Sequence, residues 1–146
     1  MDKNTSMEEH AWDFCKHDIA HLLDVARIAY IMNLEKNMGI NKELIYAAAL
    51  LHDITKWKQI AGGGPHNESA VAPARLILTE TGFSPHEIEI VLDAILHHRK
   101  GPDKNSKAYD FSRLIYKADK KSRACYMCPY DKMSCNWAHM NNKLRL

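Results

Sequence analysis

The chain has 146 residues, a length that suits one domain with a hydrophobic core and leaves little room for a second. Its 20 Lys and Arg residues nearly balance its 18 Asp and Glu residues, for a formal net charge of +2, so no strong overall field favours DNA or an anionic membrane. The first ten residues are polar and charged, and the longest apolar run, LIYAAALL, is far shorter than the roughly 20 residues of a membrane-spanning helix. We therefore expect a cytoplasmic protein that has neither a membrane nor nucleic acid as its partner.

Apolar residues recur with the 3.6-residue period of α-helices along most of the chain, and the alternation typical of half-buried strands is nearly absent. The first expected helix begins at Ile19, carries a wide apolar stripe through Leu34, and has Gly39 as its C-terminal stop. Asn41 is the candidate N-cap of a second helix, KELIYAAALLHD. The pattern predicts an all-α fold.

Turn residues separate the later helices. Three glycines and a proline make residues 61–65 a loop, and His66 lies at or near the start of the next helix. Ser-Pro-His-Glu at 84–87 is a capping-box start for a helix that Gly-Pro at 101–102 ends. The segment YDFSRLIYKADKKSRAC is helical by its spacing. We expect a compact bundle of about five to seven helices in residues 1–124, with residues 125–146 as a Cys-containing tail packed on the same domain.

Several expected helices carry, or begin with, residues that bind metal ions, each beside apolar positions: His21, His52 with Asp53, His66, His97 or His98, and Asp119. Imidazole and carboxylate together suit Fe, Mn, Zn or Ni, and a bridging carboxylate can hold two ions about 3.5–4 Å apart. Taken singly, His21 is also explained as a hydrogen-bonded core histidine and Asp119 as a solvated helix charge. The adjacent pair His52 and Asp53 at the end of a core helix is harder to explain without a shared partner, and a cation supplies one.

These residues carry a resemblance to a known family. The segments HLLDVARIA, AALLHDITK, PH, AILHHR and LIYKADKKSR, spread over about residues 15–124, resemble the HD-domain superfamily of metal-dependent phosphohydrolases. The resemblance implies that one metal ion is bound by His21, His52, Asp53 and Asp119. It also implies that Asp53 bridges to a second ion held by His66 and His98, as in HD-type diadenosine tetraphosphate hydrolases. One or two divalent ions are expected, among Fe, Mn, Co, Ni, Zn and Mg.

Three details of the resemblance involve a choice. A second His-Asp pair, His17 and Asp18, stands in a polar setting, and we interpret it as a decoy. We choose His98 as the ligand because its spacing in AILHHR matches the family's histidine at that helix end, which leaves His97 to support the ligands or contact substrate. Thr55 stands where the family usually has Gly, and this difference leaves the ligands untouched but narrows the pocket.

The reaction that the resemblance implies is hydrolysis of a phosphate ester or anhydride by a metal-bound hydroxide. The expected substrate is a small phosphorylated molecule, and nucleotides are the common substrates of the family. The candidate catalytic residues are Asp53, Lys56 and Arg99. Lys56 lies about one helical turn after Asp53, so its ammonium can contact phosphate unless it is an ordinary surface lysine. Arg99 offers a planar fork to phosphate, or else caps the carbonyls of its helix end.

In the sequence KADKKSR, basic residues lie on both sides of Asp119. Lys117, Lys120, Lys121 and Arg123 either help to gather an anionic substrate or form a solvated helix face. Two alternatives to a hydrolase use the same pattern. One is a di-iron oxygenase of the HD type, and the other is a non-catalytic, metal-stabilised module whose tail binds nucleic acid or a partner.

The C-terminal tail has its own metal-binding pattern. Cys125, Cys128 and Cys135 fall within eleven positions and suit a structural Zn²⁺ or an iron–sulfur cluster. Cys15 is our choice as the fourth ligand, because it precedes the first metal-bearing helix, and His139 is the alternative. Ordinary unliganded thiols are the simpler explanation of the same residues.

Overall fold

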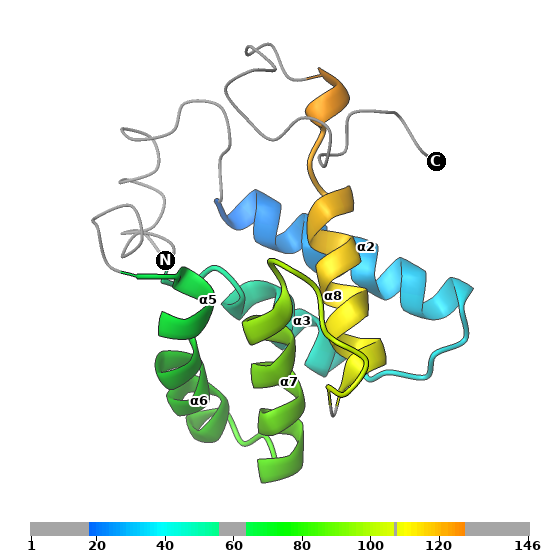
Figure 1. Ribbon diagram of the computed structural model, residues 1–146. Coiled ribbons are helices and arrows are strands. Elements are labelled where there is room, and N and C mark those ends of the chain that lie inside the picture. The colour runs from blue at the N-terminus through cyan, green and yellow to red at the C-terminus, as the bar shows by residue number, and fades with distance from the viewer. Residues whose placement is uncertain (1–17, 56–63, 107, 128–146) are drawn as a thin grey trace.

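The computed structural model describes residues 18–55, 64–106 and 108–127 of the chain. All regular structure in these ranges is helical: α2 (Ile19–Glu35), α3 (Lys42–Leu51), α5 (His66–Ser69), α6 (Val71–Glu80), α7 (Pro85–His97), α8 (Tyr109–Lys121) and the 3₁₀ turn η1 (Cys125–Met127) (Figure 1). The prediction of an all-α bundle is confirmed.

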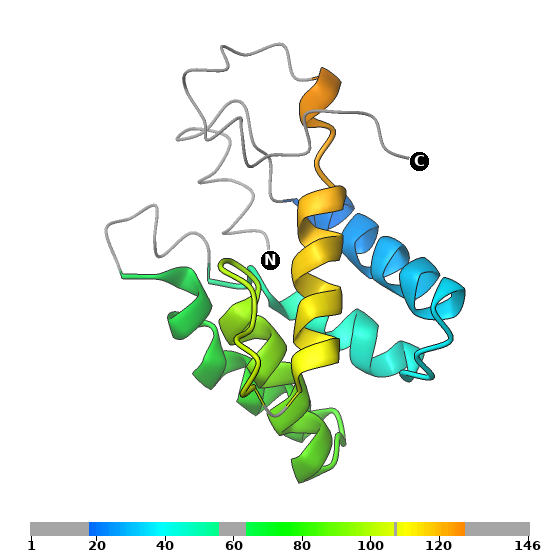
Figure 2. The same ribbon diagram turned by 45° about the vertical axis from the view of Figure 1, so that its right-hand side comes forward.

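The helices pack around one core. α2 lies against α3 and α8, and α7 lies against α3, α6 and α8, as the two views in Figures 1 and 2 show. Each of the four central helices places a fully buried aliphatic side chain in this core, namely Val25, Ile45, Ile95 and Ile115. Burying one such side chain stabilises the fold by about 1.5–3 kcal/mol. This packing brings residues near position 20 beside residues near position 120.

The first long helix ends earlier than the sequence pattern predicts. Asn37 has a φ of 49°, in the left-handed region, and its N–H donates to the carbonyl of Leu34 at 3.1 Å. The next N–H, of Met38, donates to the carbonyl of Asn33 at 3.0 Å, which completes a Schellman motif. The expected stop at Gly39 is therefore wrong. Asn is one of the few non-glycine residues that adopt this conformation readily, and it closes α2 two positions before the glycine.

The two predicted helix starts differ in how fully they form. At α7 the capping box is confirmed: Ser84 Oγ accepts from the N–H of Glu87, and Glu87 Oε2 accepts from the N–H of Ser84 at 2.8 Å. Asn41 is the N-cap residue of α3, but its side chain makes no capping hydrogen bond. Local sequence thus determines where both helices begin, and only α7 gains the extra stabilisation of a side-chain cap.

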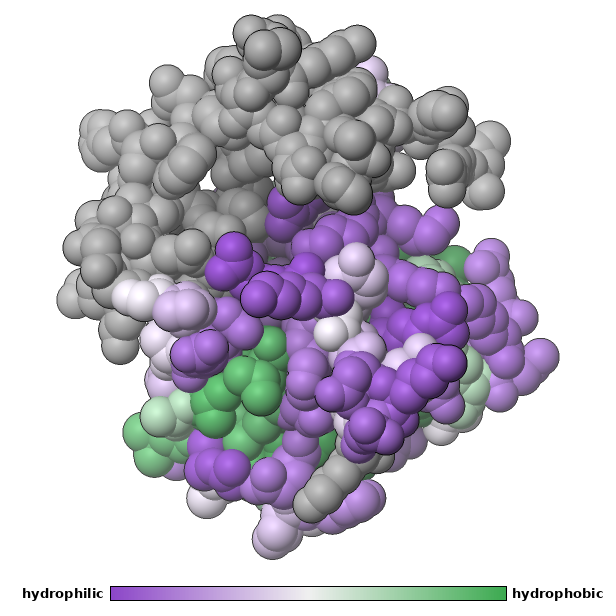
Figure 3. Space-filling model, in the orientation of Figure 1, coloured by the Kyte–Doolittle hydropathy of each residue, from purple (hydrophilic) through white to green (hydrophobic). Residues whose placement is uncertain are grey.

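The exterior is mostly polar. Figure 3 shows a largely hydrophilic face on which hydrophobic surface gathers over α6 and α7, and Leu76 and Leu96 are exposed on these two helices. Within the parts of the chain that the structure describes, none of the helices combines the length and the hydrophobicity needed to cross a lipid bilayer.

Candidate metal centre

Five polar side chains meet in the interior where α2, α3, α7 and α8 converge. His21 comes from the first turn of α2, His52 and Asp53 directly follow α3, His98 follows α7, and Asp119 lies near the end of α8. All five are buried, and His52 and Asp119 are fully so. The packing of the helices thus brings together five of the six residues that the resemblance implies as metal ligands.

Asp119 faces the imidazoles of His21 and His52. Its Oδ1 lies 3.4 Å from Nε2 of His21 and 3.7 Å from Nε2 of His52. The donor atoms of these three residues lie within 4.8 Å of one another, close enough to hold one metal ion.

Asp53 faces two histidines with its two oxygens. Its Oδ2 lies 3.4 Å from Nε2 of His52, and its Oδ1 lies 3.3 Å from Nε2 of His98. Asp53, His52 and His98 form a second compact set of donor atoms, which shares His52 with the first. One carboxylate is therefore placed between two neighbouring groups of possible ligands.

Backbone carbonyls orient two of the imidazoles. His52 and His98 are the C-cap residues of α3 and α7, where helix carbonyls lack partners within the helix. Nδ1 of His52 lies 2.6 Å from the carbonyl of Ala49, and Nδ1 of His98 lies 2.6 Å from that of Ile95. A carbonyl only accepts, so Nδ1 carries the proton and donates it. In the neutral ring the lone pair is then on Nε2, which faces the carboxylates, as a metal ligand requires.

Ser122 orients the third imidazole, and sequence reasoning missed this residue. Its hydroxyl donates to the carbonyl of Asp119 at 2.7 Å, so its oxygen accepts from Nδ1 of His21 at 3.2 Å. The arrangement again leaves Nε2 of His21 facing Asp119. The sequence signal for this role was a serine three residues after the candidate ligand Asp119, at the end of the same predicted helix.

The buried carboxylates attract positive charge. Burial lowers the pKa of His52, but the nearby carboxylates of Asp53 and Asp119 outweigh it and raise that pKa to about 10. Burial raises the pKa of Asp119, but His21 and His52, followed by Arg123, lower it well below its usual value. Nε2 of His52 is buried and makes no well-aligned hydrogen bond to a described atom. Either a proton or a metal ion at this nitrogen supplies the charge, so the residues fit a cation.

Comparison with known proteins identifies the family. The model of the HD domain matches residues 18–131 of this chain. The chain belongs to the HD domain family. It is also 44% identical, over 133 residues, to an uncharacterized protein of Clostridium beijerinckii, and the match covers 91% of this chain and 81% of that protein. No solved structure matches the chain.

Membership in the HD domain family agrees with the buried cluster. HD domains belong to a superfamily of metal-dependent phosphohydrolases, so membership implies that the chain binds a divalent metal ion. The five buried side chains are imidazoles and carboxylates, which are donors that such an ion prefers.

The remaining residues of the HD pattern differ in how far the structure describes them. His66 is the first residue of α5, as predicted, but its side chain lies outside the description. His97 turns away from the cluster, because its Nδ1 lies 2.8 Å from the carbonyl of Asp93 and 3.4 Å from Oδ1 of the same residue. Asp18 is the N-cap of α2 and accepts from the N–H of His21 at 3.0 Å, so it has a local structural role.

The structure describes only some of the candidate catalytic residues and cysteines. Arg99 is exposed, and within the described ranges no ion pair joins it to another side chain. Cys125 begins η1 and is partly exposed. The positions outside the described residues are Lys56, Cys15, Cys128, Cys135, His17 and His139.

Thr55 is buried and contacts α5. Its Oγ1 lies 2.7 Å from Oγ of Ser69 in α5. This hydrogen bond joins the segment after Asp53 to the helix that begins at His66.

The basic run around Asp119 divides between two places. Lys120 Nζ lies 2.8 Å from Oδ2 of Asp119, and Arg123 Nη2 lies 3.5 Å from its Oδ1, so both contact the cluster. Lys117 instead lines a different part of the surface, together with Lys36 and Arg113. Lys117 therefore does not form one patch with Lys120 and Arg123.

Proposed function

We propose that this HD domain is a cytoplasmic, metal-dependent phosphohydrolase. It cleaves an ester or anhydride bond in a small phosphorylated molecule, and nucleotides are the first class of substrate to test. The family supports this proposal, and the observation that carries it is the buried set of three imidazoles and two carboxylates that face one another. Buried carboxylates in such a setting need a cation, and the family's reaction uses one.

The proposed ligands follow from the two groups of donor atoms. One ion is held by His21, His52, Asp53 and Asp119, and a second by Asp53, His98 and His66. The ions are divalent, from the set Fe, Mn, Co, Ni, Zn and Mg. The two oxygens of Asp53, which face His52 and His98 at 3.4 and 3.3 Å, support its role as the bridging ligand.

When bound, such ions supply a hydroxide nucleophile near neutral pH and stabilise charge on the phosphoryl oxygens. The residues of the chain prepare the site for this chemistry. The carbonyls of Ala49 and Ile95 and the hydroxyl of Ser122 fix the three imidazoles, so little reorganisation is needed on binding.

Cations beside the cluster suit an anionic substrate. Lys120 and Arg123 contact Asp119 and have side chains that are 29% and 19% exposed, so they extend from the buried carboxylate toward solvent. We assign them a role in attracting the phosphate group. We also assign phosphate contacts to Lys56 and Arg99, the latter because it directly follows His98 and is exposed.

The cysteines form a second, structural metal site in this proposal. Residues 1–124 make the HD domain, and the tail of residues 125–146 is packed on it through Zn²⁺ or an iron–sulfur cluster. The ligands are Cys15, Cys125, Cys128 and Cys135. Elemental analysis of the purified chain should find this metal after a chelator has emptied the HD site, and its absence would contradict the assignment.

Phosphate release tests the main proposal. Nucleotides, dinucleoside polyphosphates and phosphomonoesters are incubated with the chain and with Mn²⁺, Fe²⁺, Co²⁺ or Mg²⁺. Turnover should depend on metal and disappear in His52→Ala and Asp53→Ala, while Asp24→Ala, an exposed change on α2, should retain it. Absence of phosphate release from chain shown to contain its ions would refute the proposal. Oxygen consumption with an organic substrate would then favour an oxygenase.

A further inference from the structure

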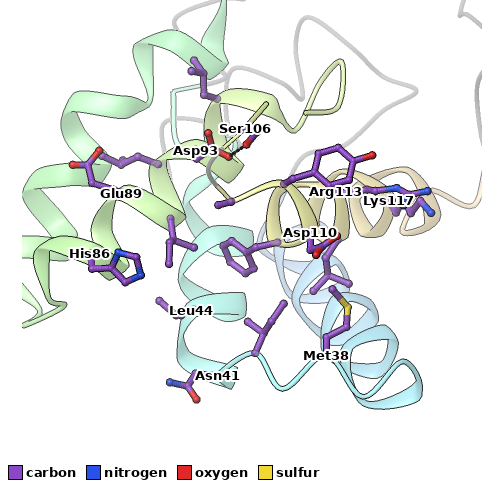
Figure 4. A pocket seen from close by; sticks show the side chains of 18 of the residues that line it. Met38, Asn41, Leu44, His86, Glu89, Asp93, Ser106, Asp110, Arg113 and Lys117 are labelled. Atoms are coloured by element: carbon purple, nitrogen blue, oxygen red, sulfur yellow. Dashed lines mark hydrogen bonds between the residues drawn. The ribbon is translucent and has the colours of Figure 1, made fainter. Parts of the chain in front are cut away.

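A wide depression lies apart from the buried metal centre. It has a volume of about 1120 Å³ and is bordered by the end of α2, the connection to α3, and parts of α3, α6, α7 and α8 (Figure 4). None of the five cluster side chains lines it. Its size is ample for a small organic ligand.

The interior of the depression is apolar. Its lining includes the core side chains Leu44, Leu92, Phe111 and Leu114, each only 3–9% exposed, and the more exposed side chains of Ile40, Ile90 and Leu96, the last of them 39% exposed. Such a surface favours the apolar body of a ligand over water.

One wall of the depression is positively charged. Arg113 and Lys117 are one helical turn apart on α8 and lie side by side in Figure 4, and Lys36 joins them from the end of α2. Within the described residues, no ion pair connects any of the three to a carboxylate. The like charges therefore repel one another, and an anion between them would relieve the repulsion.

Three carboxylates line the depression, and two of them are paired with other side chains. Glu89 Oε1 is 2.6 Å from Nη1 of Arg75. Asp93 accepts hydrogen bonds from Ser106 at 2.5 Å and from Ser112. Asp110 is exposed in the first turn of α8, one helical turn before Arg113, so it offsets part of the positive charge of this wall but not all three cations. The wall formed by α8 and the end of α2 thus keeps an excess of positive charge.

We propose that this depression binds a small organic phosphate, with the phosphate on Lys36, Arg113 and Lys117 and the apolar body on the floor. A guanidinium fork and two ammonium groups match a doubly charged phosphate better than they match a single carboxylate. The apolar floor distinguishes such a ligand from inorganic phosphate. The proposal does not depend on the phosphohydrolase activity, because the site shares no side chain with the metal centre.

Amide chemical shifts locate the binding. The full-length, ¹⁵N-labelled chain with its metal ions is titrated with 1-naphthylmethylphosphonate, whose carbon–phosphorus bond resists hydrolysis. Saturable shifts are expected at Leu44, Leu92 and Leu114. Inorganic phosphate lacks the apolar body and 1-naphthalenemethanol lacks the charge, so each should bind at least about ten-fold more weakly. Shifts confined to His52, Asp53 and Asp119, or no saturable shift, would overturn the proposal.

Charge variants test the assigned wall. Arg113→Ala combined with Lys117→Ala should weaken binding of the phosphonate by about ten-fold or more, and Arg113→Lys should weaken it less. Arg27→Ala removes one positive charge from an exposed part of α2 outside the depression and should leave the affinity unchanged. Unchanged affinity in the double variant would overturn the proposal.

Discussion

His98 Nε2 lies 3.3 Å from Oδ1 of Asp53, although helices α5, α6 and α7 separate the two residues in the chain. The other oxygen of Asp53 faces His52, its neighbour in sequence, at 3.4 Å. One carboxylate therefore joins a local pair to a histidine that only the packing of α7 on α3 brings near.

Replacing Asp53 by Asn keeps the size of the side chain and removes its charge. We expect Asp53→Asn to weaken metal binding and to reduce turnover by more than about 100-fold, since losing a ligand should cost more than losing a group that supports one. Metal content and phosphate release measure the two effects. Asp24→Asn makes the same chemical change at an exposed position of α2 and should have no effect on either. Full metal content in Asp53→Asn would show that Asp53 is not a ligand.

Ser122 has a role that can be separated from folding. In Ser122→Ala, Nδ1 of His21 loses its acceptor, so metal affinity should fall by about 10–100-fold while the thermal midpoint of the metal-free protein changes little. Thr79→Ala is the matched control, because Thr79 also donates to a carbonyl of its own helix, far from the cluster. Equal metal affinities in the two variants would remove Ser122 from the site.

Removing the metal should destabilise the fold. Without a metal ion, protonated histidine must compensate the buried carboxylates of Asp53 and Asp119, together with Lys120 and Arg123 at Asp119. A chelator should lower the melting temperature, and added ion at a hundred times its Kd should restore about 2.7 kcal/mol. Differential scanning calorimetry measures the shift. The melting temperature of Asp53→Ala should change less than that of the wild type when chelator or metal ion is added. An equal change in both proteins would show that the stabilising metal is bound elsewhere.

The core of α8 is needed to hold Asp119 in place. Ile115 is fully buried one helical turn before Asp119, so Ile115→Ala should cost about 2–5 kcal/mol of unfolding free energy. Urea denaturation measures this cost. Ile31→Ala on α2 is the control, since Ile31 is 53% exposed and should change the unfolding free energy far less. Similar costs for both variants would contradict the packing described for α8.

The capping box of α7 should make stability depend on pH. The hydroxyl and N–H of Ser84 lower the pKa of Glu87 below its ordinary value of 4.5. A lowered pKa in the folded state means that this contribution is present above the unfolded value and is lost as pH falls through the folded one. Ser84→Ala should therefore lower the melting temperature at pH 7 and less so at pH 3. Glu80 lies in α6, outside this capping box, so Glu80→Gln should leave the pH dependence of the melting temperature unchanged.

Local sequence was sufficient to predict the all-α fold and the start of α7. The start of α7 follows from Ser84, Pro85 and Glu87, which lie within one turn and need no distant partner. The all-α fold follows from the periodicity of the apolar residues. The end of α2 shows where this approach fails, because two turn-forming residues, Asn37 and Gly39, compete, and the pair of backbone hydrogen bonds at Asn37 decides between them.

The sequence by itself determined which residue types are available for a metal centre and placed His52 beside Asp53. The sequence also favoured His98 over His97, and the structure shows that His98 faces Asp53. Only the tertiary structure decided that Ser122 supports His21, and that Lys117 lines the depression while Lys120 and Arg123 contact Asp119. The physical reason is that periodicity specifies which face of a helix is buried. The neighbours that face will meet depend on how helices distant in the chain pack against one another.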